Sequence, residues 1–226
     1  MDRERFAATL KYIRAFRLNV VVRSLLLQFS NEEKVNRVCY DDLRGFQMIE
    51  KAMLEKLFKD HGFSDFKWIK CSDIVVSNWV RFRCVFGCPA YGKKGTCPPH
   101  VPPIDECRRM ISEYGQAAVF HFEKKVESVE ERRAWGKGVV KKLVEVEREV
   151  FLSGYYKTLL VSFESCGLCE SCAVNRTECR NPRLARPGAD AMGIDVFTTV
   201  RSIGYPIEVL KDQSEAMNRY AFLLIE

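Results

Sequence analysis

The sequence predicts an α/β (or α+β) protein in which a mixed sheet is flanked by helices, with two cysteine-rich loops at the ends of strands. Through the middle of the chain, apolar runs of strand length alternate with segments whose apolar residues recur at helical spacing. Strand-like runs lead directly into both groups of cysteines. Both groups are therefore expected at the same edge of the sheet.

We divide the chain into an N-terminal helical or extended segment, residues 1–42, and a cysteine-rich domain, residues 43–226. The first segment fits a helix over 4–17 and a polar connection over 31–42. Between them, residues 18–29 fit a strand or a continued helix, because their periodicity favours neither.

The elements of the domain follow from periodicity and from residues that end helices. Runs rich in β-branched and aromatic residues predict strands over 66–69, 74–76, 117–122, 156–163 and 220–225. Apolar residues at helical spacing predict helices over 43–60, 104–114, 126–151 and, more briefly, 195–202.

Composition limits the class of protein. With 226 residues, 47 % of them hydrophobic, the chain can bury one large core. Its ten cysteines in 226 residues are below the density of small disulfide-rich secreted domains, and no signal peptide opens the chain. No apolar stretch is long enough to span a membrane. We therefore expect a protein of the reducing cytoplasm, without a membrane partner.

The formal net charge of +6 does not predict a nucleic-acid partner. Basic residues are interleaved with acidic ones, and an oxidised four-thiolate cubane adds about −2. Four arginines surround the last cysteines. They either compensate the charge of a cluster or form a docking site for an acidic partner; they are Arg176, Arg180, Arg183 and Arg186.

The most informative motif is CGLCESC, followed by CRNP. It places four thiols within a short stretch: Cys166, Cys169, Cys172 and Cys179. A cubane iron–sulfur cluster takes one thiolate on each iron and suits three closely spaced cysteines with a distant fourth, whereas zinc is usually held by two separated pairs. The motif favours a [4Fe–4S] cluster; zinc and unliganded thiols are the alternatives.

A second group lies upstream, in RCVFGCPAYGKKGTCPPH, and contains Cys84, Cys88 and Cys97. Its spacing fits a second cluster or zinc. Three cysteines leave one ligand position to be filled or left open. An open iron would bind a substrate atom, as the free position of a catalytic zinc does. The candidate fourth ligands are Cys71, His100 and Cys107.

The two other histidines have structural explanations. His61 ends a predicted helix, where an imidazole suits the helix dipole, and His121 lies in an apolar strand, where a hydrogen-bonded core histidine is expected. Neither YGKKG nor WGKG has the arrangement of a phosphate-binding loop.

The two motifs together resemble the family of predicted metal-binding proteins catalogued as domain of unknown function 2284. The matching features are Cys84-x3-Cys88, Cys97-Pro98-Pro99, CGLCESC, CRNPRLARP and AMGIDV, and the resemblance extends from about Leu54 to Glu226. It implies metal binding through both cysteine groups and no settled activity. The sequence departs from the family pattern at Gly188 and Asp190, after the ARP turn.

These observations lead to three hypotheses. The first is an iron–sulfur protein with one or two [4Fe–4S] clusters that passes electrons to an unidentified partner. The second is an enzyme that uses an open-site cluster for sulfur transfer or for activation of a small-molecule substrate. The third is an interaction module stabilised by zinc.

Overall fold

The computed structural model describes residues 51–212 and 215–226. Contacts along the chain group it into two units, Met1–Leu57 and Phe58–Glu226, and the second contains both cysteine groups. The expectations for residues 1–50, including the boundary after residue 42, lie outside the described residues. Residues 51–60 are helical, in agreement with the end of the helix expected over 43–60.

The sheet of the second unit has four strands in the order β1-β2-β4-β3. They are β1 (Phe66–Lys70), β2 (Gln116–Lys124), β3 (Thr158–Val161) and β4 (Met217–Ile225). Every neighbouring pair is antiparallel. The class is as expected, but the described sheet is antiparallel instead of mixed.

The connection between β2 and β3 explains this difference. Both strands pair antiparallel with β4, so they run parallel to each other with β4 between them. The strand–helix–strand pattern read from the sequence is therefore a split βαβ unit. Ala118 on β2 and Leu160 on β3 both lie opposite Leu223 of β4.

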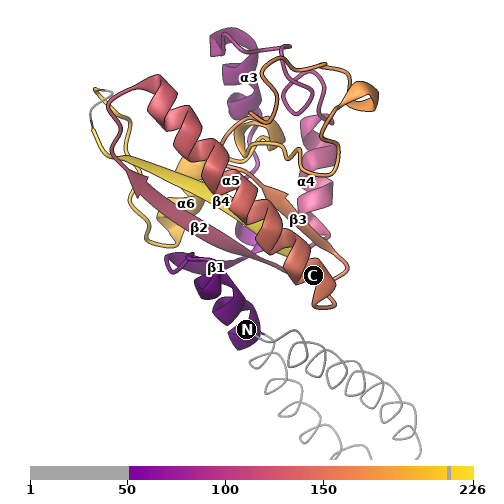
Figure 1. Cartoon of the computed structure of the whole chain (residues 1–226), viewed down its shortest axis with the longest axis vertical. Helices are drawn as coiled ribbons and strands as arrows, with labels where there is room; N and C mark the ends of the chain where they lie inside the picture. Colours follow the sequence, from indigo (N-terminus) through magenta and orange to yellow (C-terminus); the bar gives the residue numbers. More distant parts are fainter. Residues whose placement is uncertain (1–50, 213–214) are drawn as a thin grey trace, which may run out of the picture. The chain divides into compact units, whose positions relative to one another are not determined.

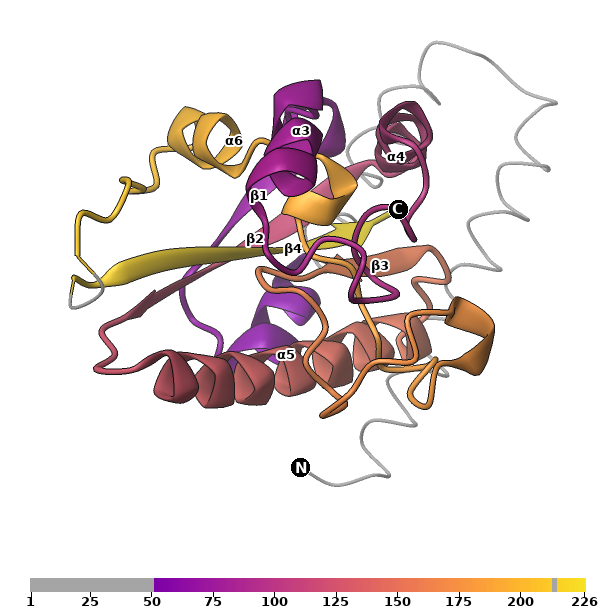
Figure 2. The same ribbon diagram turned by 90° about the horizontal axis from the view of Figure 1, so that it is seen from above.

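Besides the helical residues 51–60, the part of the chain that the structure describes has four helices. They are α3 (Asn78–Gly87), α4 (Ile104–Ser112), α5 (Val129–Leu152) and α6 (Val196–Ser202). Figure 1 shows α5 running along the sheet, and Figure 2 shows it on one face with α3, α4 and α6 on the other. Covering on both faces explains why the central strand β4 is buried from Tyr220 to Ile225 and reads as a continuous apolar run.

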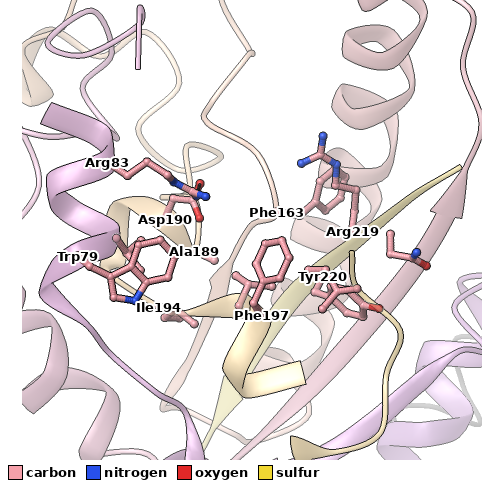
Figure 3. A pocket seen from close by; sticks show the side chains of 13 residues that line it. Trp79, Arg83, Phe163, Ala189, Asp190, Ile194, Phe197, Arg219 and Tyr220 are labelled. Atoms are coloured by element: carbon pink, nitrogen blue, oxygen red, sulfur yellow. Dashed lines mark hydrogen bonds and ion pairs between the residues drawn. The ribbon is translucent and has the colours of Figure 1, made fainter. Parts of the chain in front are cut away.

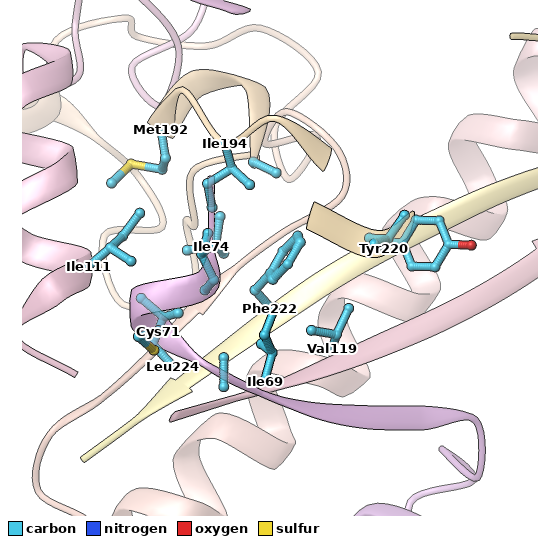
Figure 4. Close-up of a cluster of buried hydrophobic side chains, with 14 of the residues drawn as sticks. Ile69, Cys71, Ile74, Ile111, Val119, Met192, Ile194, Tyr220, Phe222 and Leu224 are labelled. Atoms are coloured by element: carbon cyan, nitrogen blue, oxygen red, sulfur yellow. The ribbon is translucent and has the colours of Figure 1, made fainter. Parts of the chain in front are cut away.

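The side of the sheet that faces α4 and α6 carries the largest hydrophobic cluster, shown in Figure 4. Ile69, Phe222 and Leu224 supply the sheet side, and Ile111 and Ile194 pack against them. On the opposite side, Phe58 and Phe120 pack edge to face, with ring centroids 5.0 Å apart. The two cores hold the sheet from both sides and so fix the loops that leave it.

Helix α5 begins at the N-cap Ser128, with hydrogen bonds that satisfy the backbone on both sides of it. Ser128 accepts a hydrogen bond from the backbone N–H of Glu131, and the Glu131 carboxylate accepts one from the N–H of Glu127. The helix therefore starts at Val129, three residues later than its apolar pattern indicates.

Two expectations before the first cysteine group are wrong. Residues 74–76 form no strand; Val76 makes a single bridge to Ile194, and the chain then enters α3, a helix that periodicity does not indicate. The first cysteine group therefore begins on a helix and not at the end of a strand. The second does follow a strand, β3.

Candidate metal centre

The four cysteines of the second motif surround one cavity. Cys166, Cys169, Cys172 and Cys179 all line a space of about 140 Å³, and residues 93–96 of the first cysteine loop line it as well. The chain brings these thiols together because it leaves β3 and turns back through the 3-10 turn η3 (Arg176–Glu178). Four soft sulfur donors that line one cavity are chemistry suited to a thiolate-bound metal centre.

Backbone and side-chain N–H groups point at two of these sulfurs. Cys172 Sγ accepts from the N–H of Gly95 at 3.5 Å and from that of Val174 at 3.4 Å, and Cys169 Sγ accepts from Asn181 Nδ2 at 3.1 Å. Val174 reaches this geometry at a φ of 64°. Hydrogen bonds of this kind stabilise thiolates and tune the potentials of iron–sulfur clusters.

The surroundings of the Cys172 thiol favour its ionisation. The backbone hydrogen bonds from Gly95 and Val174, with smaller contributions from the charges of Lys94 and Arg180, lower its pKa. Because the thiolate is the form that binds metal, this sulfur is prepared for ligation.

The two loops are in close contact at Gly95. A Cβ added there would lie 2.6 Å from the carbonyl oxygen of Val174, so glycine is required at this approach. One residue earlier, Lys94 Nζ donates to Ser165 Oγ at 2.8 Å. The first loop therefore forms one wall of the cavity that the second loop surrounds.

The first cysteine group has a different electrostatic setting. Cys84 lies on α3, Cys88 directly follows the helix and Cys97 lies in the loop beyond. Burial raises the pKa of Cys84 and of Cys97, and the charge of Cys88 raises both further. These three thiols lie within electrostatic range of one another, and a metal would have to displace their protons.

The three candidate fourth ligands lie in different environments. Cys71 is 2 % exposed within the hydrophobic cluster, where burial raises its pKa to about 12. Cys107 is 1 % exposed on α4, with Sγ 3.5 Å from the carbonyl of Pro102. His100 is exposed on the loop, with Nε2 3.3 Å from the carbonyl of Gly92. Which of them completes the first group, or whether the position is open, stays a prediction.

Across residues 51–212 and 215–226, no three His, Cys, Asp or Glu side chains form a group that could hold a single metal ion. In the same ranges, no helix has the apolar length needed to cross a membrane.

The positions after the ARP turn have defined roles. Asp190 Oδ2 accepts from Arg83 Nη2 at 2.8 Å and so ties the 3-10 turn η4 (Asp190–Met192) to α3. A Cβ on Gly188 would lie 3.2 Å from the carbonyl oxygen of Glu164, so the turn packs directly against the backbone that leads into Cys166. The departures from the family pattern therefore lie where the two cysteine regions are joined.

Two of the four arginines bind protein groups. Arg186 Nε lies 2.7 Å and 3.0 Å from the two carboxylate oxygens of Glu147, and Arg176 Nη2 donates to the Pro182 carbonyl at 2.7 Å. Arg180 lines the cysteine cavity and contributes to the lowered pKa of Cys172. Arg186 is therefore part of an internal ion pair.

The two other histidines bind side chains. His121 Nδ1 lies 2.6 Å from Asp65 Oδ2, and its Nε2 lies 2.7 Å from Asn218 Oδ1, as expected for a hydrogen-bonded core residue. His61 Nε2 lies 3.2 Å from Glu149 on α5, a contact that sequence analysis did not anticipate.

An aromatic pocket lies beside the first cysteine group. It has a volume of about 150 Å³, and Figure 3 shows Trp79 and Arg83 from α3 on one side, with Phe163 and Phe197 across from them. Trp79 Nε1 donates to Asp195 Oδ2 at 3.2 Å, which holds the indole in place. Sequence analysis missed this pocket because its residues come from segments far apart in the chain.

Comparison with known proteins agrees with this geometry. A family described as "predicted metal-binding protein (DUF2284)" matches residues 67–225. No curated protein and no solved structure matches the chain. The matched segment covers most of the chain and includes both cysteine groups. The chain therefore belongs to the DUF2284 family of predicted metal-binding proteins.

Proposed function

We propose that this protein binds a [4Fe–4S] cluster through Cys166, Cys169, Cys172 and Cys179, and that it transfers electrons to a partner. The observation that carries the proposal is that all four thiols line one cavity of about 140 Å³. Family membership supports metal binding, the N–H···S contacts support thiolate ligands, and the cysteine spacing supports iron–sulfur over zinc.

The residues present fit such a group. A cubane needs one thiolate for each iron, which the four cysteines provide, and it carries net negative charge that N–H donors and nearby cations stabilise. Gly95, Val174 and Asn181 supply the donors, and Lys94 and Arg180 the charge. When bound, the cluster would supply a one-electron redox centre.

The first cysteine group supports a second candidate function. Cys84, Cys88 and Cys97 would hold a second cluster, with the fourth position filled by another residue or left open to a substrate. The charge of Asp190 acts on Cys84, and Asp190 also lines the aromatic pocket. A small molecule in that pocket would lie beside the first group, and this is the observation behind an enzyme with an open iron as the second candidate.

The first experiment is an anaerobic purification with metal and acid-labile sulfide counts. One cluster should give about four iron and four sulfide per chain, two clusters twice that, with a broad absorption near about 400 nm. A colourless protein with stoichiometric zinc would refute the iron–sulfur proposal and support a zinc-stabilised module.

Electron transfer and substrate activation are then separated by adding sulfide or a small thiolate to the reduced and oxidised protein. An open iron at the first group should change its electron paramagnetic resonance spectrum, and Cys97→Ala should abolish that change. If the electron paramagnetic resonance spectrum of the wild type does not change when sulfide or thiolate is added, the result would support an electron carrier.

A further inference from the structure

A large basic pocket adjoins the cysteine cavity. It has a volume of about 680 Å³ and lies between the first turns of α5 and residues 163–170 of the second cysteine loop, with Cys166 and Cys169 in its wall. Two carboxylates, from Glu164 and Glu170, face six cationic side chains. The six are Lys94, Arg132, Arg133, Lys137, Arg186 and Arg219.

Within the described residues, five of the six cations make no close ion pair, although the charges of four of them act on the carboxylate of Glu164: Arg219, Arg132, Lys94 and Arg133. Arg186 is neutralised by Glu147. Among the described residues, none of the five others has a carboxylate within ion-pair distance, and Lys94 donates only to the hydroxyl of Ser165. The Nε of Arg132 is buried, and it has no hydrogen-bond partner among the described residues. A buried guanidinium N–H that binds nothing is costly unless a ligand supplies the acceptor.

Two guanidinium groups are also held near each other. Burial lowers the pKa of Arg219 on β4, Glu164 opposes that shift, and Arg132 on α5 lowers it further. Like charges brought together in a partly buried cavity repel each other; the Glu164 carboxylate offsets part of this repulsion, and a further anion between them would reduce it more.

We propose that the basic pocket binds a small molecule with at least two carboxylate or phosphate groups, next to Cys166 and Cys169. The volume falls within the range of about 300–1,000 Å³ that small-molecule sites occupy. Arginine side chains bind carboxylate and phosphate oxygens through paired N–H donors, so Arg132 and Arg219 are the expected anchors. Lys137, one turn along α5, would hold a second anionic group.

Compensation of cluster charge does not account for the pocket by itself. That role requires cations near the thiolates, which Lys94 and Arg180 provide. It does not require an open volume of about 680 Å³ lined by cations of α5 and β4. The anion site rests on these residues and stands whether or not the four cysteines hold a cluster.

The test is isothermal titration calorimetry on the full chain, purified anaerobically, with citrate, pyrophosphate and acetate as probes. Citrate or pyrophosphate should bind with saturation and at a stoichiometry of one, and acetate should bind far more weakly. The stronger of the two polyanions identifies carboxylate or phosphate as the ligand group. The affinity should fall as salt is raised.

Matched variants on α5 distinguish the pocket from general surface charge. Arg132→Gln and Lys137→Gln should each raise Kd about tenfold or more, because each removes a charge-assisted contact. Lys141→Gln removes an exposed lysine one turn after Lys137 that does not line the pocket, and it should leave Kd unchanged. Iron content and far-UV circular dichroism of each variant show whether cluster and fold are intact.

Three results would overturn the proposal. One is that neither citrate nor pyrophosphate binds to the folded wild type. Another is that Lys141→Gln weakens binding as much as Lys137→Gln, which would mean non-specific attraction. The last is that an acidic polypeptide such as polyglutamate binds while both small polyanions fail, which would make the surface a protein docking site.

Discussion

The backbone N–H of Gly95 donates a hydrogen bond to Cys172 Sγ over 3.5 Å, across 77 positions of sequence. This contact joins the two cysteine loops at a sulfur atom. The first loop therefore affects the ionisation of a thiol in the second, because the Gly95 hydrogen bond is the largest of the causes that lower the pKa of Cys172.

Gly95→Ala should separate the loops. The new Cβ would meet the Val174 carbonyl at 2.6 Å, and a backbone atom cannot move aside cheaply. We expect a loss of about 1–3 kcal/mol in the free energy of unfolding, together with reduced metal content. Gly138→Ala is the control, since nothing lies within 4 Å of its Cβ position and alanine should stabilise α5 by about 0.5–1 kcal/mol. If urea unfolding gave the same free energy of unfolding for both variants, the close contact at Gly95 would be contradicted.

Cys169→Ala should remove the cluster proposed for the second group. The loop has little apolar content, so metal ligation would hold it in place, and loss of one thiolate should release iron and sulfide and expose the loop to protease. Metal analysis and limited proteolysis measure both effects. Full iron and sulfide content in this variant would argue against ligation by the second group.

Cys71→Ser tests whether the core cysteine binds metal. Its thiol lies in the hydrophobic cluster shown in Figure 4, so a hydroxyl there should cost about 1–3 kcal/mol of stability while the iron count stays the same. Chemical denaturation measures the change in stability, and metal analysis of the same preparation gives the iron count. A drop in iron per folded chain would make Cys71 the fourth ligand of the first group.

Glu147→Ala should destabilise the protein strongly. The Glu147 side chain is 6 % exposed, pairs with Arg186 at 2.7 Å and accepts from the N–H of Leu160 at 2.9 Å. Its removal leaves a half-buried guanidinium and a buried N–H without partners, a loss of about 3–5 kcal/mol. Glu145→Ala, on the exposed side of the same helix, should change stability by less than about 0.5 kcal/mol. Thermal unfolding of the two variants side by side checks the difference.

The free energy of unfolding should fall in acid as the Asp65 carboxylate becomes protonated. Partial burial alone would raise the pKa of this carboxyl, but hydrogen bonds from His121 and Tyr205 outweigh burial and bring it below the ordinary value of 3.8. A lowered folded-state pKa gives stability that is fully present above pH 3.8 and is lost as the pH falls through the folded value. Asp65→Asn should remove that part of the pH dependence.

Tyr205→Phe provides the companion measurement. It removes the 2.7 Å hydrogen bond from the phenol to Asp65 Oδ1, so the folded-state pKa of Asp65 should rise toward 3.8. The acid-induced loss of stability should then be smaller than in the wild type and should be complete at a higher pH. Unfolding free energies measured from neutral pH to about pH 2 would show it. Superimposable curves for the wild type and both variants would contradict the assignment.

The strands were predictable where burial leaves a clear pattern. The run from Tyr220 to Ile225 is apolar because helices cover both faces of β4, and it identifies a strand without further information. Periodicity does not show that β4 lies between β2 and β3, because a run of apolar residues does not indicate which strands pair with it. The expected mixed sheet was wrong for that reason.

Helix α3 escaped prediction because its apolar residues face outward. Phe82 and Phe86 are 61 % and 80 % exposed and stack on each other, and Val80 is the buried residue of the helix. Without an apolar stripe toward the core, the amphipathic signal is weak. Ser77 before the helix and Pro89 after it were the available boundary signals.

The four cysteines of the second motif were predictable as a set because they are close in sequence. The contact of Gly95 with Cys172 and the cations of the basic pocket were not, because Arg132 and Arg219 come from α5 and β4 and meet only after the sheet has formed. Local spacing identifies ligands, whereas the groups that tune them depend on tertiary contacts.

The position of β4 has a consequence for biosynthesis. It is an inner strand of the sheet, yet all ten cysteines precede it in the sequence and are therefore translated before it. A ribosome therefore exposes every thiol before the scaffold that positions them can close. Insertion of the proposed cluster would then have to wait until β4 has been made, and a nascent chain arrested before Met217 should contain all the proposed ligands without the sheet that positions them.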